Sequence, residues 1–228
     1  MNKLLRIFIR GSFITIFLIT TVLVFPVREI RAEGAGSTSA SFLSLPVGAK
    51  SASMGELKSA LEGDPFNWIA NPATPLDSEG NSFGLFHSQW ILNTYYDNAF
   101  YRKKLNGLVV IGAGFGYLSS PEIQAYNEIG EPTGSITDNT FRGTLGITFM
   151  PIRGFSFGLN VNYFQEKLAE WTARGYSADI GAIYNVPVIP ITMGVVLQNL
   201  GPEITFLSHK EELPLTFRAG LCLSLIHI

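Results

Sequence analysis

The sequence predicts an all-β protein: a transmembrane antiparallel β-barrel of about eight strands, preceded by a short helical, plug-like segment. Three observations predict this fold class. Large apolar and small polar residues alternate across residues 140–199, turn residues separate the alternating segments, and the chain begins with an export signal. Because successive side chains of a strand point to opposite faces, each alternating segment has one apolar and one polar face.

The alternation is clearest in residues 155–163, and segments 140–149, 176–185 and 191–198 repeat it. The second face carries mostly Gly, Ser, Thr and Asn. A soluble secreted β-sandwich that acts as a binding module is the alternative, but such a sheet buries its apolar face and carries charge on the other. The small polar face therefore favours a barrel interior. In residues 155–163 the large set is Phe155, Phe157, Leu159, Val161 and Tyr163, and the small set is Ser156, Gly158, Asn160 and Asn162.

Composition excludes several classes of protein. The 228 residues include 16 basic and 18 acidic side chains without a basic stripe, so we expect no nucleic-acid partner. The single cysteine, Cys222, rules out a disulfide framework and a lipid anchor at the cleavage site.

Residues 1–32 are predicted to be a signal peptide. Basic residues at positions 3, 6 and 10 precede an apolar run over 12–25, and residues 30–32 form a cleavage site. The run is shorter than the roughly 20 residues of a spanning helix, which favours cleavage over a retained membrane anchor. We therefore expect an exported protein of the cell outer membrane.

Residues 33–80 are predicted to form the plug-like segment, since 42–75 lacks strand alternation. Met54, Leu57 and Leu61 predict a helix over 52–61 with one apolar stripe. Asp-Pro at 64–65, Asn-Pro at 71–72 and Thr-Pro at 74–75 predict turns after it. Sequence pattern leaves two interpretations open: an internal plug, or a lead-in segment with no plugging role.

Residues 81–228 are predicted to supply the barrel strands. Glycines 112, 114 and 116 lie on one side of the third strand, where they leave interior space. The polar stretch 121–138 predicts a long hairpin, and 151–153 and 187–190 predict short connections. Segments 82–92 and 94–102 are aromatic, and their alternation is too weak to assign faces. The strands expected are 82–92, 94–102, 108–118, 140–149, 155–163, 176–185, 191–198 and 215–221.

No motif predicts catalysis or a cofactor. The glycine-rich run 112–116 lacks the third glycine of a dinucleotide fingerprint, because Tyr117 stands there, and no helix pattern follows. The histidines at 87, 209 and 227 are scattered singly, so no metal site is expected. There is no Gly-x-Ser-x-Gly elbow either. The protein is thus predicted to be non-enzymatic.

Three charges are candidates for the barrel lumen: Arg142, Arg174 and Asp179. Asp179 lies on the polar face of an otherwise apolar strand, and we expect the two arginines to face inward with it. A lumenal ion-pair ladder is one interpretation. We favour the other, in which these charges hydrate and brace the interior.

Several motifs resemble the PorV/PorQ family of outer-membrane proteins: SASFLSLPVGAKSASMG (39–55), NPA (71–73), GEPTGSITDNTF (130–141), GYSADIGAIY (175–184), VLQNLGPEI (196–204) and LPLTFRAGL (213–221). The resemblance covers nearly the whole mature chain. The motif positions that it marks are Asn71, Pro72, Ala73, Asp179, Gly181, Asn199, Gly201 and Pro202.

This resemblance implies a FadL-like barrel of 14 strands with a small N-terminal plug. It implies transport or type IX secretion-related delivery to the cell surface, with outer-membrane lipid, secretion components or secreted cargo as partners. A FadL-type uptake channel for hydrophobic small molecules is the alternative. Because about eight strands are expected against 14, we interpret the chain as a C-terminally truncated fragment, with 224–228 as a non-native tail.

Overall fold

The structure is a computed structural model that describes residues 38–56, 58–61, 63–76, 80–206 and 209–224. The chain divides into two compact units, Met1–Ala35 and Gly36–Ile228. The predicted signal peptide lies outside the described residues. None of the helices in the described part of the chain is long and apolar enough to cross a membrane.

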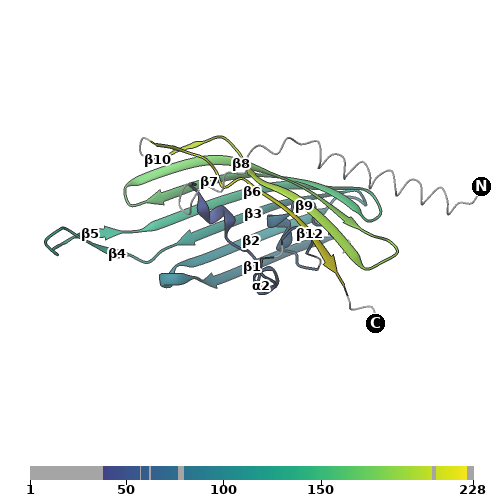
Figure 1. The fold of residues 1–228 in the computed structure, drawn as a ribbon, viewed down its shortest axis with the longest axis horizontal. Helices are drawn as coiled ribbons and strands as arrows, with labels where there is room; N and C mark the ends of the chain where they lie inside the picture. The colour runs from purple at the N-terminus through teal and green to yellow at the C-terminus, as the bar shows by residue number, and fades with distance from the viewer. Residues whose placement is uncertain (1–37, 57, 62, 77–79, 207–208, 225–228) are drawn as a thin grey trace, which may run out of the picture. The chain divides into compact units, whose positions relative to one another are not determined.

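The second unit is all-β and is built on one antiparallel eight-stranded sheet (Figure 1). The eight strands are those expected from the sequence, which confirms the all-β prediction. The sheet is open: β1 and β12 are its edges within the described residues. In sheet order the strands are β1 (Asn81–Gln89), β2 (Tyr95–Lys104), β3 (Val109–Ser119), β6 (Asp138–Ile152), β7 (Phe155–Leu168), β8 (Trp171–Asn185), β9 (Ile191–Leu200) and β12 (Thr216–Leu223).

The connections differ between the two ends of the sheet. At one end they are short, and Gly154, with φ of +83°, completes the turn between β6 and β7. At the other end they carry two small hairpins and the 3₁₀ turn η2 (Ile91–Asn93). The expected polar hairpin is confirmed as β4 (Ile123–Tyr126) and β5 (Pro132–Ile136). The second hairpin pairs β10 (Ile204–Phe206) with β11 (His209–Glu211).

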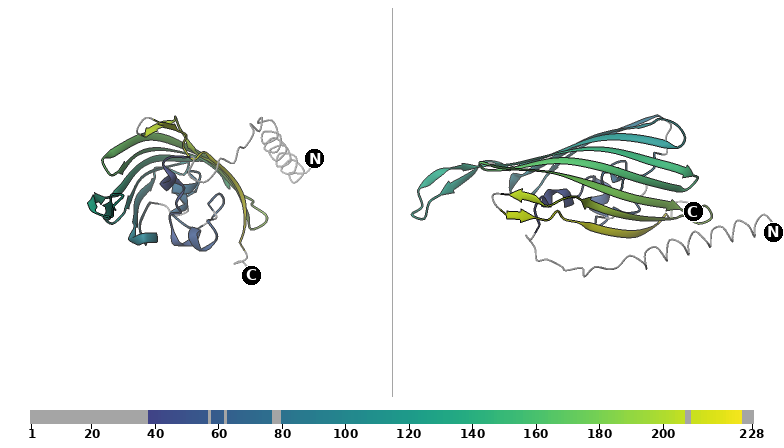
Figure 2. Two further views of the ribbon diagram at one scale, coloured as in Figure 1. Left: turned by 60° about the vertical axis from the view of Figure 1, so that its left-hand side comes forward. Right: turned by 90° about the horizontal axis from the view of Figure 1, so that it is seen from above.

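The N-terminal segment lies in the concave side of the curved sheet (Figure 2). We call residues 38–76 the plug segment. It contains the 3₁₀ turn η1 (Ser41–Ser44) and the short helices α2 (Ala49–Ser53) and α3 (Asn67–Ala70).

The predicted helix over 52–61 is wrong. Helix α2 begins earlier and ends at Ser53, because Gly55 and Glu56 have φ of +67° and +62°. Met54 is exposed and Leu61 is buried, so the expected apolar stripe does not form. Leu57 lies outside the described residues. The helix-like spacing of these apolar residues therefore spans a turn that follows α2.

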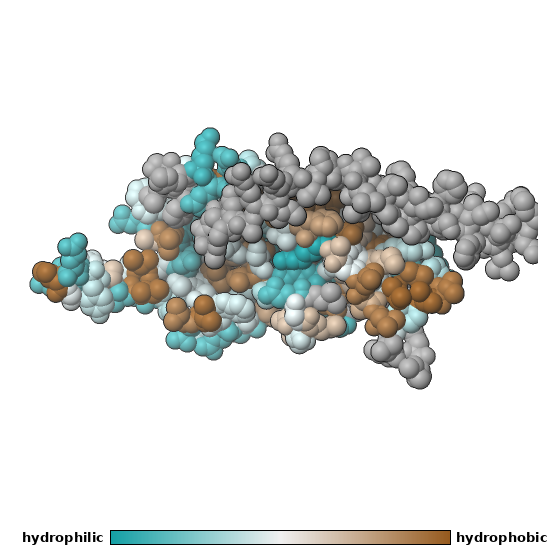
Figure 3. Space-filling model, viewed as in Figure 1, coloured by the Kyte–Doolittle hydropathy of each residue, from teal (hydrophilic) through white to brown (hydrophobic). Residues whose placement is uncertain are grey.

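The two faces of the sheet differ in burial. On β6 to β9, the apolar residues of the alternation are mostly exposed on the convex face, and the small polar residues are buried on the concave face. Leu145, for example, is 68% exposed, whereas its neighbour Thr144 is 3% exposed. On the plug side, hydrophilic surface lies at the middle and hydrophobic side chains lie toward the margins (Figure 3).

Strands β1 and β2 also alternate in burial, although their sequences did not reveal it. Their concave face carries Phe86, Tyr96 and Phe100, while their convex face is also apolar and aromatic. The inner aromatic residues pack against the plug segment, with the rings of Phe66 and Phe100 4.9 Å apart. Because both faces carry aromatic residues, polarity could not distinguish them.

Candidate functional site

The candidate functional site is the contact between the plug segment and the concave face of the sheet, which we call the plug–sheet interface. Its core is the turn 71–76, where Asn71 follows helix α3. The Asn71 Oδ1 accepts a hydrogen bond from the Ala73 N–H at 3.0 Å, and the Asn71 carbonyl accepts one from the Thr74 N–H. A side-chain turn of this kind holds the chain in one conformation without helix or strand.

Side chains of the sheet bind the carbonyl oxygens of this turn in succession. Thr148 Oγ1 donates to the Pro72 carbonyl and Ser156 Oγ to the Ala73 carbonyl, both at 2.6 Å. Arg102 Nη2 then donates to the Thr74 carbonyl at 2.5 Å.

The same arrangement includes helix α3 before the turn and the last residue of the turn. Asn160 Nδ2 donates to the Trp68 carbonyl at 3.0 Å, and Lys104 Nζ to the Leu76 carbonyl at 3.5 Å. Buried carbonyl groups are costly unless they are hydrogen-bonded. The polar concave face therefore stabilises a backbone that has few hydrogen bonds of its own.

Glycines of the concave face give the plug segment room. A Cβ at Gly158 would overlap the Pro72 carbonyl, and one at Gly181 would overlap Asn71 Oδ1. At Gly194 it would overlap the Ser59 carbonyl. These glycines lie on β7, β8 and β9. The interior space expected from the glycines of β3 is likewise filled, since a Cβ at Gly112 would lie 2.7 Å from the Trp68 ring.

Trp68 is the largest fully buried side chain of the plug segment. Its ring packs near Phe100, and the Arg102 guanidinium lies 5.6 Å from its centroid in a cation–π contact. Arg102 thus contacts two parts of the plug segment, the aromatic ring of Trp68 and the carbonyl of Thr74.

A second polar cluster surrounds Asp179 on β8. Its carboxylate accepts hydrogen bonds from Asn162 Nδ2 and from the Asn199 N–H, both at 2.8 Å. Strand β9 has a bulge opposite Asp179, where Asn199 adopts φ of +62°. A bulge leaves a backbone group without a partner in the strand ladder. Here the group is the Asn199 N–H, and the Asp179 carboxylate accepts its hydrogen bond. Asn162 is in turn held by Thr144 Oγ1 at 2.7 Å.

The two predicted lumenal arginines lie on opposite faces. Arg142 is buried on the concave face and donates to Asn98 Oδ1 at 3.2 Å. Arg174 is exposed on the convex face, where its Nε donates to Gln165 Oε1 at 3.0 Å. The expectation that Arg174 faces inward was wrong: it is five residues from Asp179, and an odd separation in a strand places side chains on opposite faces.

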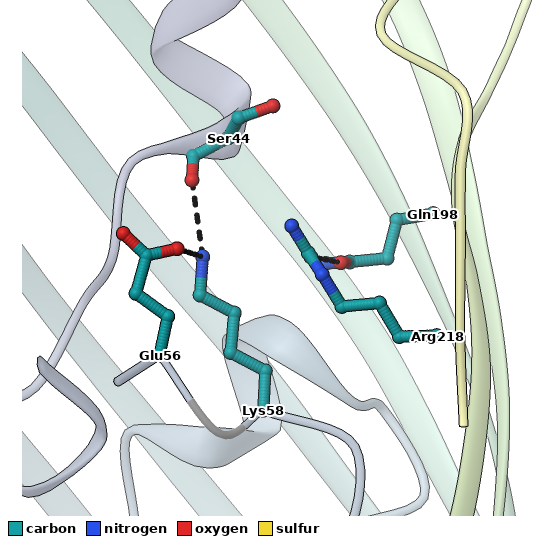
Figure 4. A network of polar contacts seen from close by, with 5 residues as sticks. All are labelled: Ser44, Glu56, Lys58, Gln198 and Arg218. Atoms are coloured by element: carbon teal, nitrogen blue, oxygen red, sulfur yellow. Dashed lines mark hydrogen bonds and ion pairs between the residues drawn. The ribbon is translucent and has the colours of Figure 1, made fainter. Parts of the chain in front are cut away.

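Two cations meet at the edge of the plug–sheet interface (Figure 4). Lys58 is buried and donates to the Ser44 carbonyl at 3.0 Å, with the Glu56 carboxylate 3.4 Å away. The Arg218 guanidinium donates to Gln198 Oε1 and points toward Lys58. Burial, with added repulsion from Arg218, lowers the pKa of Lys58.

The marked positions therefore form two groups. Asn71 and Pro72 meet Gly181 in the plug–sheet interface, and Ala73 lies beside Gly158 there. Asp179 meets Asn199 at the bulge, and Gly201 lies beside it, where a Cβ would overlap the Tyr176 carbonyl. Pro202 is exposed and joins neither group.

Sequence reasoning missed the donors to the plug carbonyls, among them Arg102, Thr148, Ser156 and Asn160. Thr148, Ser156 and Asn160 lie on the polar side of a strand, and that was the available signal, whereas the faces of β2, which carries Arg102, could not be told apart by polarity. All four donate to backbone carbonyl oxygens of the plug segment. Every residue has such a carbonyl, so the sequence did not indicate which ones would be bound.

Among the described residues, no group of three or more His, Cys, Asp or Glu side chains could hold a metal ion. His87 has a cross-strand partner that spacing did not reveal, since its Nδ1 lies 2.6 Å from Asp97 Oδ1. Both side chains are exposed. Comparison with protein-family models, with curated proteins and with solved structures gave no match.

Proposed function

We propose that the protein is an outer-membrane β-barrel protein of the PorV/PorQ type, non-enzymatic, that acts in transport or in type IX secretion-related delivery to the cell surface. The observation that carries the proposal is the burial pattern: the sheet buries its polar face under the plug segment and exposes its apolar face. A soluble sandwich would bury the apolar face. Hydrocarbon is the solvent in which an exposed apolar face is stable.

Two further features support this proposal. The strands have 8 to 15 residues, and a tilted strand needs about 9–11 to cross a bilayer. The two hairpin-bearing connections lie at the same end of the sheet, although the β7–β8 connection there has only residues 169–170. Outer-membrane barrels likewise have their long connections at one end, which faces the exterior. The proposal includes further strands that pair with the edges β1 and β12.

A role in delivery is tested by deleting the gene in the cell that makes the protein. Secreted cargo should then accumulate in the periplasm, and a plasmid copy should restore its surface delivery. Normal cargo delivery together with reduced uptake of a long-chain fatty acid would favour the FadL-type channel instead. Recovery of the protein in the soluble periplasmic fraction would contradict both roles.

The plugging role is tested separately. Deletion of 42–75 removes the contacts of the Pro72, Ala73 and Thr74 carbonyls with the sheet. If the plug segment blocks a pore, the conductance of the full-length protein in planar bilayers should rise. Unchanged conductance would contradict the plugging role and would mean that the segment only stabilises the sheet.

A further inference from the structure

The β4–β5 hairpin has surface chemistry unlike that of the rest of the sheet. It projects beyond the end of the eight-stranded sheet and is clear of the plug segment (Figures 1 and 2). Ile123, Tyr126, Ile129 and Ile136 are all exposed on it, Ile129 to 79%. Ile123 and Ile136 are cross-strand partners, so their side chains lie together on one face.

The hairpin is held in shape. Ser120 and Asp138 close its base, where the Ser120 N–H donates to the Asp138 carbonyl at 2.8 Å. At its tip, Asn127 Oδ1 accepts hydrogen bonds from the N–H groups of Ile129 and Glu131. A surface ordered before binding loses less conformational entropy when a partner docks.

The hairpin is also acidic. Residues 120–138 contain Glu122, Glu128, Glu131 and Asp138 and no lysine or arginine. Hydrophilic and hydrophobic residues lie next to one another on it, at the left of Figure 3. Anionic lipid phosphates would be repelled by this charge, which argues against the hairpin resting on a membrane surface.

We propose that the β4–β5 hairpin is a docking site for a basic polypeptide segment, which adds a strand to the hairpin edge and covers its isoleucines. Two properties support this partner. Within the described residues, the hairpin forms a separate two-stranded sheet whose outer edges pair with no other strand. A basic segment would complement its glutamates, and backbone pairing to a free edge is a common way of binding extended peptides. The inference rests on the proposed function in one respect: the outer-membrane location determines on which side of the membrane the hairpin meets its partner.

The test begins with a photo-cross-linking amino acid at position 129 of the full-length protein in its own cells. Position 188 is the matched control, because Val188 is 90% exposed at the short-turn end of the sheet. We expect one polypeptide adduct at 129 and none at 188. Failure to form an adduct at 129, or an adduct to lipid alone, would overturn the docking site.

The identified polypeptide is then purified and its Kd for the reconstituted protein is measured. The triple variant Glu122→Gln, Glu128→Gln, Glu131→Gln should raise the Kd at least about tenfold and reduce its salt dependence, and Ile129→Ser should raise it as well. Glu170→Gln, on another connection at the same end, is the control and should leave the Kd nearly unchanged. Binding that ignores the three glutamates would overturn the proposal. Outer-membrane location without an adduct contradicts the docking site alone, whereas an adduct on a protein outside that membrane contradicts the proposed function.

Discussion

The concave and convex faces of the sheet belong to the same strands and have opposite chemistry. On β7, Asn160 is fully buried and binds the plug backbone, whereas Leu159 beside it is 40% exposed. The concave face is constrained by hydrogen bonds and by glycines that admit no side chain. The convex face has cross-strand contacts, such as the ring pair Tyr163–Tyr176, but none with the plug segment, and its residues face the surrounding solvent. Substitutions should thus act through packing on one face and through the surrounding solvent on the other.

The largest effect is expected at Gly158 on the concave face. Gly158→Ala places a methyl group against the Pro72 carbonyl, so we expect a loss of about 3 kcal/mol or more of unfolding free energy. Gly143→Ala is the matched control on the convex face of β6, where a Cβ has 3.5 Å to its nearest neighbour, the Phe141 ring. Urea unfolding in lipid vesicles measures both. Equal losses would mean that the plug segment does not contact the sheet at Gly158.

The next effect concerns the convex face. Leu159→Arg should cost about 2–4 kcal/mol in a bilayer if Leu159 lies near its midplane. Ile152→Arg, close to a turn, should cost only about 0–1 kcal/mol. The same vesicle unfolding assay gives both values. If neither substitution changed stability, the convex face would be meeting water.

A third effect tests the bulge. Asp179→Ala leaves the Asn199 N–H and the Asn162 amide without their buried acceptor, so we expect a loss of roughly 1–3 kcal/mol. Asp179→Asn keeps one acceptor oxygen and should lose less. Comparable stability of Asp179→Ala and the parent protein in the unfolding assay would contradict a structural role for this carboxylate.

The smallest effect is a pH dependence at Lys58 in the plug segment. Its pKa is lowered from 10.5 by burial and by Arg218. Between the lowered pKa and 10.5 the unfolded chain binds the extra proton, so stability should rise with pH across this window. Lys58→Met should reduce the rise, as measured by unfolding at a series of pH values. The prediction would be contradicted if the stability of the parent protein fell with pH across this window while that of Lys58→Met stayed constant.

The contrast between the faces also explains what the sequence could predict. The strands β6 to β9 followed from alternation and turn residues, whereas β1 and β2 were predicted from their aromatic content without an assignment of faces. The faces of β1 and β2 did not follow, since Phe86 and Phe100 serve the plug segment while the outer face is also aromatic. Strand parity alone could have placed Arg174 outside.

The plug segment was predictable in position but not in conformation. The prolines at 65 and 72 marked turns correctly, whereas the helix expected over 52–61 ends at Ser53. Its contacts could not be predicted, because Thr148 and Ser156 bind carbonyl oxygens that any residue would supply. Likewise the contact of Asp179 with Asn199 depends on a bulge that has no signature in the sequence.

The central claim, that the convex face meets hydrocarbon, is tested most directly by a spin label at position 145. Leu145→Cys is made with Cys222→Ser, labelled and reconstituted in vesicles, and compared with a label at Glu128→Cys on the exposed hairpin. We predict that the label at 145 collides with oxygen dissolved in the lipid and is shielded from a water-soluble nickel chelate, with the reverse at 128. Ready access of the nickel chelate to position 145 would contradict the account.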